Sequence, residues 1–274
     1  MPGIPVVVSS FGIPVTPVLA NAPVMTIAEN GHGTPITPTG SGGTPLIWSP
    51  LDMGADLLAW WDASEGVSLS GTAVTAWVDK KSGYSAAQGT GASQPTYSAT
   101  GFNGAPCVIS DGTDDYLEIA TSPFPINADP VEIWAVAQTT DTISTATRIL
   151  ISYGAAAATA RRFGRQTGNT MFVATGTGGG APFAATVATL PSRHTLVARI
   201  TATASFVSID DTAEETTAAV PATNNTRFRL FANSGSASAN QFWQGPARHI
   251  FLTLPLSAEK RLLMQRWLFA QRAL

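Results

Sequence analysis

The stretch VEIWAVAQ, residues 131–138, indicates the fold class of this chain. It is short, largely apolar and rich in β-branched and aromatic residues, which suit a pleated and half-buried surface. Similar runs occur on both sides of it, separated by turns of Gly, Asn, Asp and Ser: Leu57–Trp61, Val74–Val78, Cys107–Ser110, Tyr116–Ile119, Arg148–Tyr153, Thr170–Ala174, His194–Ala202, Phe206–Ile209, Thr226–Ala232 and Ala247–Thr253. Because no long helix interrupts these runs, they predict an all-β fold with two packed antiparallel sheets.

One α-helix is predicted near the C-terminal end. Ser257 is a suitable N-cap, because its hydroxyl can accept a hydrogen bond from a backbone N–H of the first helical turn. Four residues then follow at spacings of four, three and four and share one helical face: Leu263, Trp267, Ala270 and Leu274. A short helix that covers the β-domain accounts for this pattern, and a partner-binding helix is the alternative.

Residues 1–50 differ in composition from the rest of the chain. They hold nine of the 19 prolines, and Gly3–Val6 (GIPV) recurs as Gly12–Val15. Proline fixes φ and removes a backbone donor, so this segment predicts an extended arm without a core of its own. We therefore expect an anchoring arm over 1–50, a β-domain over 51–274 and a homo-oligomer. The arm would dock through six apolar side chains: Val6, Val7, Val8, Val24, Met25 and Ile27.

Composition excludes several classes of function. Charged residues make up 12% of the chain and the net charge is −3, which argues against a nucleic-acid partner. No apolar run approaches the roughly 20 residues of a membrane-spanning helix, and no basic residue precedes the signal-peptidase-like Ala20–Ala22, so we expect neither membrane insertion nor a signal peptide. Cys107 is the single cysteine, which excludes a disulfide framework, and the three histidines lack metal-ligand spacing. We expect no metal and no cofactor.

The acidic residues do not form a recognisable catalytic pattern. A glycoside hydrolase needs two carboxylates on either side of the scissile bond. Glu214 and Glu215 are adjacent, so in a strand they would point to opposite faces. Asp111, Asp114 and Asp115 form the densest acidic cluster, for which an ordinary turn is favoured over a calcium site. The sequence therefore predicts a protein that is not an enzyme.

Aromatic residues beside Arg, Asn or Asp are candidates for sugar binding, because a pyranose has one apolar face and a ring of hydroxyls. The basic run RRFGRQ, residues 161–166, is the most unusual, since its guanidiniums could hold an acidic polysaccharide or pair with an acidic arm of a neighbouring subunit. The candidates for carbohydrate binding, expected on loops, are Tyr84, Tyr153, Arg161, Arg162, Phe163, Arg165 and Trp243.

Several motifs in order carry a family resemblance. LAWWDAS at 58–64 and VTAWVDK at 74–80 precede GFNGAP at 101–106 and DGTDDYL at 111–117, and FWQG at 242–245 comes before the last apolar run. Over residues 55–274 the sequence resembles the concanavalin A-like lectin/glucanase superfamily, in its laminin-G-like branch. The resemblance implies a jelly-roll of two antiparallel sheets and frequent glycan binding.

The arm and this resemblance together predict a bacteriophage-type virion protein, such as a tail fibre, spike or capsid decoration. Its arm would bind other virion proteins, and its sandwich, on the particle surface, would bind host surface polysaccharide for attachment. One alternative is a purely structural assembly subunit without a ligand. A second alternative is a polysaccharide-degrading glycoside hydrolase.

Overall fold

A computed structural model describes the greater part of the chain after residue 47. The described residues are 48–124, 131–140, 147–154, 160–166, 170–175, 185–186, 193–200, 205–210, 215–217, 227–233 and 241–273. All of them except Trp48 belong to a compact unit that begins at Ser49. The predicted arm, with Val6, Val7, Val8, Val24, Met25 and Ile27, lies outside these residues and stays a prediction.

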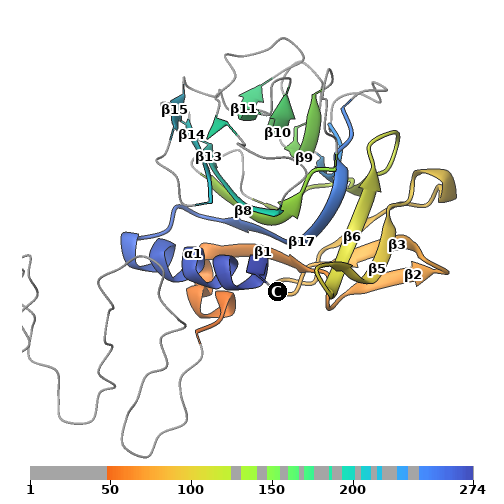
Figure 1. Cartoon of the computed structure of the whole chain (residues 1–274), viewed down its shortest axis with the longest axis horizontal. Helices are drawn as coiled ribbons and strands as arrows, with labels where there is room; N and C mark the ends of the chain where they lie inside the picture. The colour runs from red at the N-terminus through yellow and green to blue at the C-terminus, as the bar shows by residue number, and fades with distance from the viewer. Residues whose placement is uncertain are drawn as a thin grey trace, which may run out of the picture. The chain divides into compact units, whose positions relative to one another are not determined.

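The described part of the chain is mostly antiparallel β-structure (Figure 1). Two short 3-10 helices lie at Pro50–Asp56 and Gly91–Ser93. The strands are β1 (Leu57–Asp62), β2 (Val67–Ser70), β3 (Ala73–Val78), β4 (Ser85–Ala87), β5 (Thr96–Phe102), β6 (Ala105–Asp111), β7 (Leu117–Ile119), β8 (Val131–Gln138), β9 (Arg148–Tyr153), β10 (Arg161–Gln166), β11 (Thr170–Thr175), β12 (Ala185–Thr186), β13 (Arg193–Ile200), β14 (Ser205–Ile209), β15 (Glu215–Thr217), β16 (Phe228–Leu230) and β17 (Gln244–Thr253).

Strand β17 holds the sheet together. Its C-terminal half lies between β1 and β8, so that Ile250 is opposite Trp61 on one side and Ala135 on the other. Its N-terminal part pairs with β6 instead, where Pro246 is opposite Ile109. From β8 the pairing continues through β13 and β14 to β15, and from β4 it runs through β7, β16, β9, β10 and β11 to β12.

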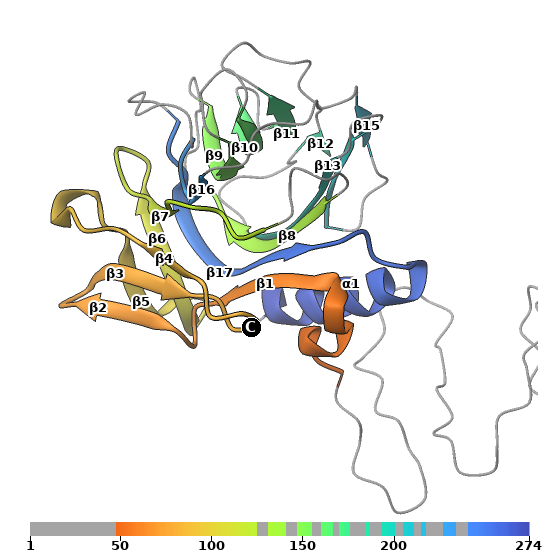
Figure 2. The same cartoon turned by 180° about the vertical axis from the view of Figure 1, so that it is seen from behind.

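These pairings join all described strands into one sheet that curls into a nearly closed, barrel-like form (Figure 2). The antiparallel β class and the C-terminal helix are confirmed. A jelly-roll of two separate sheets is not confirmed, because β6 and β17 connect the two sides of the fold by hydrogen bonds.

The core lies inside this curled sheet and is rich in aromatic rings. Trp61 stacks on Phe228 with ring centroids 5.3 Å apart, and Trp77 stacks on Phe231 at 6.3 Å. All four side chains are fully buried. Burying a side chain of this size stabilises the fold by roughly 2–3 kcal/mol, so these rings contribute much of the stability of the unit.

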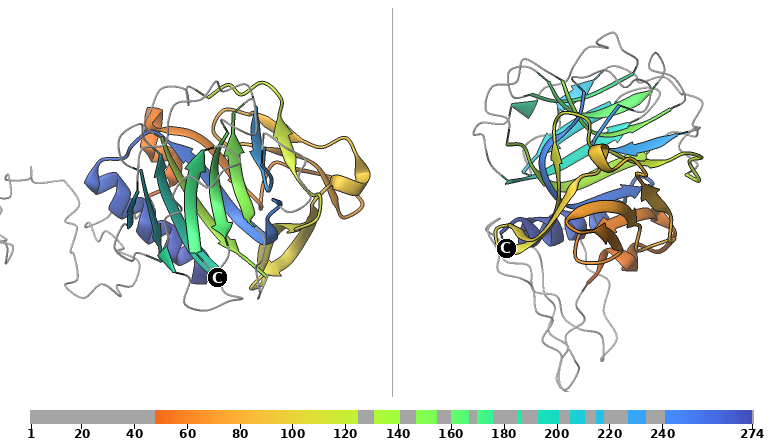
Figure 3. Two further views of the ribbon diagram at one scale, coloured as in Figure 1. Left: turned by 90° about the horizontal axis from the view of Figure 1, so that it is seen from above. Right: turned by 90° about the vertical axis from the view of Figure 1, so that its right-hand side faces the viewer.

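Helix α1 (Ala258–Ala273) covers the outer side of β1 and β17, and β9, β10 and β11 lie on the opposite side of the core (Figures 1 and 3). Its first turn begins as predicted, because the backbone N–H of Lys260 donates to the Ser257 hydroxyl at 3.3 Å. The predicted buried face is only partly right. Met264 and Leu268 take the fully buried positions, and Ala270 is exposed.

Trp267 fixes the middle of the helix to the sheet, since its ring meets Trp60 edge-on at 5.5 Å and Phe251 at 5.7 Å. Within the described residues, no helix is both long enough and apolar enough to cross a membrane.

Candidate functional site

Four polar residues form a row across the side of the sheet that faces away from the core. Glu118 on β7 is opposite Arg229 on β16, Arg229 is opposite Ser152 on β9, and Ser152 is opposite Arg162 on β10. Their neighbours along each strand point to the core, as Leu117, Phe228, Ile151 and Phe163 do. Because adjacent strands are about 4.8 Å apart, this polar row is about 14 Å long.

The first half of the polar row is a paired network. The Nε of Arg229 is 2.6 Å from Glu118 Oε2, and the Nε of Arg227 is 3.4 Å from the same oxygen. A terminal nitrogen of Arg229 donates to the carbonyl of Asn233 at 3.0 Å. The central carbon of the guanidinium lies 4.4 Å from the centroid of the Tyr116 ring, so a cation–π contact stabilises its position.

The second half of the row is built differently. Ser152 donates its hydroxyl hydrogen to the carbonyl of Ala232 at 2.5 Å. Arg162 is 3% exposed, and its guanidinium lies 6.0 Å from the centre of the Phe172 ring. Ile149, Phe172 and Ala174 form a small buried apolar cluster on this face. Burial lowers the pKa of Arg162 below its ordinary value, because a charged group loses hydration there.

This combination of groups is suited to carbohydrate recognition. Guanidiniums can donate hydrogen bonds to sugar hydroxyls, and a partly exposed ring beside them can provide apolar contact area. The half-buried Tyr116 and the buried Phe172 stand near the two arginines of the row. The row is therefore the candidate functional site in the described part of the chain.

The basic run 161–166 is placed differently from the prediction. It forms strand β10 and not a loop, so its side chains alternate between the two faces. Arg161 and Arg165 share the core side with Phe163, and Arg162 points to the opposite side. The three arginines therefore cannot act together on one ligand surface. All three are buried.

The other sequence candidates are also separated. Tyr153 is on β9, so its predicted loop placement is wrong. Trp243 immediately precedes β17. Both side chains are fully buried in the core, so neither lies on an accessible loop surface. Tyr84 is 37% exposed just before β4, and its ring meets Phe124 edge-on at 5.4 Å. A role of these residues in sugar binding stays a prediction.

Sequence reasoning missed Glu118, Ser152 and Arg229 as site residues. A signal was present, since LEI at 117–119 and FRL at 228–230 each place a charged residue between two apolar ones. In a strand this pattern turns the charge away from the core. The pairing of these strands, far apart in sequence, is what brings the charges together.

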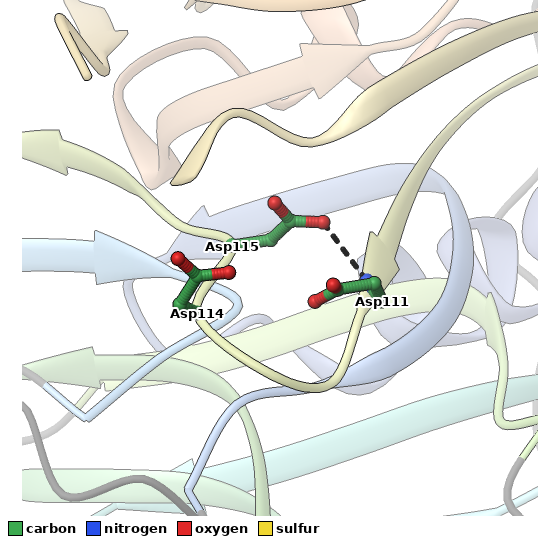
Figure 4. A group of neighbouring side chains, drawn as sticks. All are labelled: Asp111, Asp114 and Asp115. Atoms are coloured by element: carbon green, nitrogen blue, oxygen red, sulfur yellow. Dashed lines mark hydrogen bonds between the residues drawn. The ribbon is translucent and has the colours of Figure 1, made fainter. Parts of the chain in front are cut away.

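The acidic turn is a second candidate (Figure 4). One oxygen from each of Asp111, Asp114 and Asp115 lies within 4.8 Å of the others. Asp115 accepts the backbone N–H of Asp111 at 2.9 Å, Asp111 accepts that of Thr113 at 2.7 Å, and Asp114 accepts the Ser93 hydroxyl at 3.1 Å. These bonds fit the turn favoured from the sequence. Burial, more than the nearby carboxylates, raises the pKa of Asp115 to about 7.

No family profile matches the sequence, and no curated protein is similar to it. Solved structures do match in fold. A Trypanosoma rangeli sialidase in complex with 2,3-difluoro-KDN is 12% identical, with a TM-score of 0.57 over 90% of this chain and 36% of that one. The same sialidase with 2,3-difluorosialic acid gives a TM-score of 0.57 at 11% identity, over 82% of this chain and 36% of that one.

A third match is domain 4 of AbnA, a GH43 extracellular arabinanase from Geobacillus stearothermophilus, in complex with arabinotriose. It is 12% identical with a TM-score of 0.50, over 77% of this chain and 98% of that one. This chain spans only about a third of the length of the sialidases, but nearly all of the arabinanase domain. The chain thus has a fold that is also found within glycosidases.

These matches correct two interpretations of the sequence. The prediction of a virion structural protein is contradicted, because the similar structures come from a sialidase and an arabinanase. The prediction that the chain is not an enzyme is contradicted by the same finding, since the matched proteins are glycosidases. The glycoside-hydrolase alternative agrees with them better than either interpretation.

Proposed function

We propose that this chain is a carbohydrate-binding protein of a glycoside-hydrolase system, built on a concanavalin A-like jelly-roll. The observation that carries the proposal is the match to domain 4 of the arabinanase, which spans 98% of that domain and whose structure contains arabinotriose. The ligand is a short oligosaccharide, and the polar row on β7, β16, β9 and β10 holds it.

The chemistry of the row supports this assignment. Sugar-binding surfaces combine a few fixed polar groups with aromatic contact area. The Glu118–Arg229 ion pair is held by strand pairing and by the carbonyl of Asn233, so its polar atoms are fixed before a ligand arrives. The Tyr116 ring beside it is half-buried and supplies an apolar surface.

Calorimetric titration of the full chain with arabinotriose tests the proposal. Two tyrosines provide a matched comparison, because Tyr116 contacts the polar row and Tyr84 contacts Phe124 instead. We expect Tyr116→Ala to weaken binding at least tenfold and Tyr84→Ala to change it less than twofold. Stacking on a ring is worth roughly 1–2 kcal/mol, which corresponds to this change. Equal effects of the two variants would rule out the row as the site, and no binding to any oligosaccharide would end the proposal.

A second candidate function, hydrolysis of the bound glycan, is favoured by one specific observation. A retaining glycosidase uses two carboxyl groups about 5 Å apart, one of them a proton donor with a raised pKa. Asp115 is buried with a pKa of about 7, and one carboxylate oxygen of the exposed Asp111 lies within 4.8 Å of one oxygen of Asp115. In this reading Asp115 is the acid and Asp111 the nucleophile.

Release of reducing ends from arabinan and from sialylated oligosaccharides measures this activity directly. Catalysis at the acidic turn requires that Asp115→Asn and Asp111→Asn each lower the rate at least a hundredfold. Glu65→Gln is the control, because Glu65 is an exposed carboxylate elsewhere on the surface. If the unaltered protein releases no sugar, or if the Asp variants retain full activity, the acidic turn is not a catalytic centre.

A further inference from the structure

Arg162 differs from the other buried or half-buried arginines of the described chain. Most of them have a carboxylate or a carbonyl partner: Arg229 pairs with Glu118, Arg199 and Arg261 with Glu132, and Arg272 with Asp210, while Arg148 donates to Gly112 and Arg248 to Gln271. In the ranges that the structure describes, the Arg162 guanidinium makes no hydrogen bond and no ion pair. It lies over the Phe172 ring instead.

The position of the guanidinium is specific. The Nε of Arg162 is buried without a hydrogen-bond partner. The residue is 3% exposed, and its strand position places the side chain on the face that points away from the core. Across the strand pairs it stands between Ser152 on β9 and Ala174 on β11. On the same face, Ile149, Phe172 and Ala174 form a buried apolar cluster, and the guanidinium of Arg162 lies over the Phe172 ring.

A guanidinium in this position has lost most of its hydration without gaining a counter-charge. Removing a charged group from water is costly unless a partner of opposite charge replaces the lost hydration. Burial is the one cause that shifts the pKa of Arg162, and no neighbouring carboxylate offsets it. Arg162 is therefore a buried cation that lacks an anionic partner within the described residues.

We infer that Arg162 binds the carboxylate of an acidic sugar unit, so that the ligand of the polar row is a uronic-acid-type oligosaccharide. This inference rests on the proposed carbohydrate-binding function and adds the class of ligand. The planar guanidinium of arginine matches a carboxylate with two parallel hydrogen bonds, and the carboxylate also supplies the counter-charge that a neutral sugar lacks.

The neighbouring residues fit the rest of such a ligand. The Ser152 hydroxyl opposite Arg162 is fully buried and donates its hydrogen to the Ala232 carbonyl, so it places no competing anion beside the guanidinium. The next cation of the row is Arg229, two strands away and thus about 10 Å from Arg162. Its charge is already balanced by Glu118, so it would bind hydroxyls, and Arg162 would bind the acid group.

The experiment uses two ligands that differ in whether their carboxyl groups are free or methyl-esterified. The full chain is titrated with trigalacturonic acid and with its fully methyl-esterified form, and arabinotriose serves as the neutral reference. We expect the acid to bind at least tenfold more tightly than the ester. Arg162→Gln should remove this preference, so that the acid and the ester bind equally, and Arg162→Lys, which keeps the charge but lacks the planar guanidinium, should restore part of it.

Arg266→Gln is the matched control, because it removes the same charge from an exposed position on α1. The control should keep the full preference for the acid. Equal binding of acid and ester, or an unchanged preference in Arg162→Gln, overturns the inference while arabinotriose binding still supports the proposed function. Absence of binding to all three ligands overturns both. The melting temperature of each variant separates a loss of folding from a loss of selectivity.

Discussion

Arg162 and Ser152 lie directly opposite each other on β10 and β9, on the side of the sheet that faces away from the core. Ser152 is fully buried and bonded to a backbone carbonyl, and Arg162 is buried with a guanidinium that no carboxylate of the described chain neutralises. A charge kept in this way reduces stability, and proteins keep such groups where function requires them.

The stability cost of Arg162 can be measured without a ligand. Replacing a buried charge with an apolar side chain of similar length is often neutral or stabilising. We expect Arg162→Met to raise the free energy of unfolding by about 1 kcal/mol. Arg229→Met, which leaves Glu118 without its closest partner, should lower it by about 2 kcal/mol. Urea denaturation of the two variants gives both numbers. A loss of stability in Arg162→Met would indicate a structural role for this arginine.

The polar row also shows how far the sequence predicts this fold. The bounds of β8 and β9 match the predicted runs 131–138 and 148–153, because β-branched and aromatic residues fill them. Strand β10 was missed, since three arginines within RRFGRQ indicate a solvated loop when the sequence is considered alone. Its pairing partners β9 and β11 are its neighbours in sequence, but the burial of its arginines is a property of the folded sheet, which local propensity does not contain.

The candidate site was predictable only in part, because local alternation is visible in the sequence and long-range strand pairing is not. Alternation in LEI and FRL turns Glu118 and Arg229 outward, but the register that places them 2.6 Å apart joins segments more than a hundred residues apart in sequence. The virion interpretation depended on the proline-rich composition of 1–50, which lies outside the described residues, together with the family resemblance of the β-domain. It was contradicted by the glycosidase matches of the β-domain.

Asp115 should make the protein less stable as the pH rises. Its folded pKa of about 7 lies above the ordinary value of 3.8, so the folded state binds this proton more tightly than the unfolded state does. The stability that this proton confers is full below pH 4 and is lost as the pH rises towards 7, at about 1.4 kcal/mol per pKa unit. Asp115→Asn should therefore stabilise the protein more at pH 8 than at pH 5 in denaturant titrations. An equal effect at both values of pH would contradict the raised pKa.

His249 should give the opposite pH dependence, with the stability of the protein falling as the pH drops. It is buried against Trp60 and Trp267, and burial lowers its pKa from 6.5 to about 4, although Asp62 lies 3.5 Å away. The folded state therefore favours the neutral ring, and stability is full above pH 6.5 and falls as the pH drops towards 4. Between pH 7.5 and 5 this group should cost about 2 kcal/mol. His249→Asn should show a smaller loss over the same interval in thermal melts, with the unaltered protein measured in the same buffers; identical slopes would argue against this origin.

Glu132 links α1 to the sheet through a buried charge cluster. It is fully buried, and Oε1 lies 2.7 Å from nitrogens of both Arg199 and Arg261. Glu132→Gln leaves these guanidiniums without their shared anion and should lower the free energy of unfolding by about 3 kcal/mol. Glu65→Gln is the matched control, since Glu65 pairs with Lys80 at the surface and its loss should cost less than about 1 kcal/mol. Chemical denaturation of both variants measures the two losses in the free energy of unfolding. Similar losses would mean that burial adds little to the strength of this cluster.

The β-domain is proposed to bind an oligosaccharide on the polar row. Saturation-transfer NMR of the full chain, mixed with arabinotriose and trigalacturonic acid, tests it most directly. We predict transfer of magnetisation to the sugar protons, stronger for the acid, and its loss in the Tyr116→Ala variant. No transfer to either sugar would contradict oligosaccharide binding, and transfer that Tyr116→Ala leaves unchanged would show that the polar row is not the binding site.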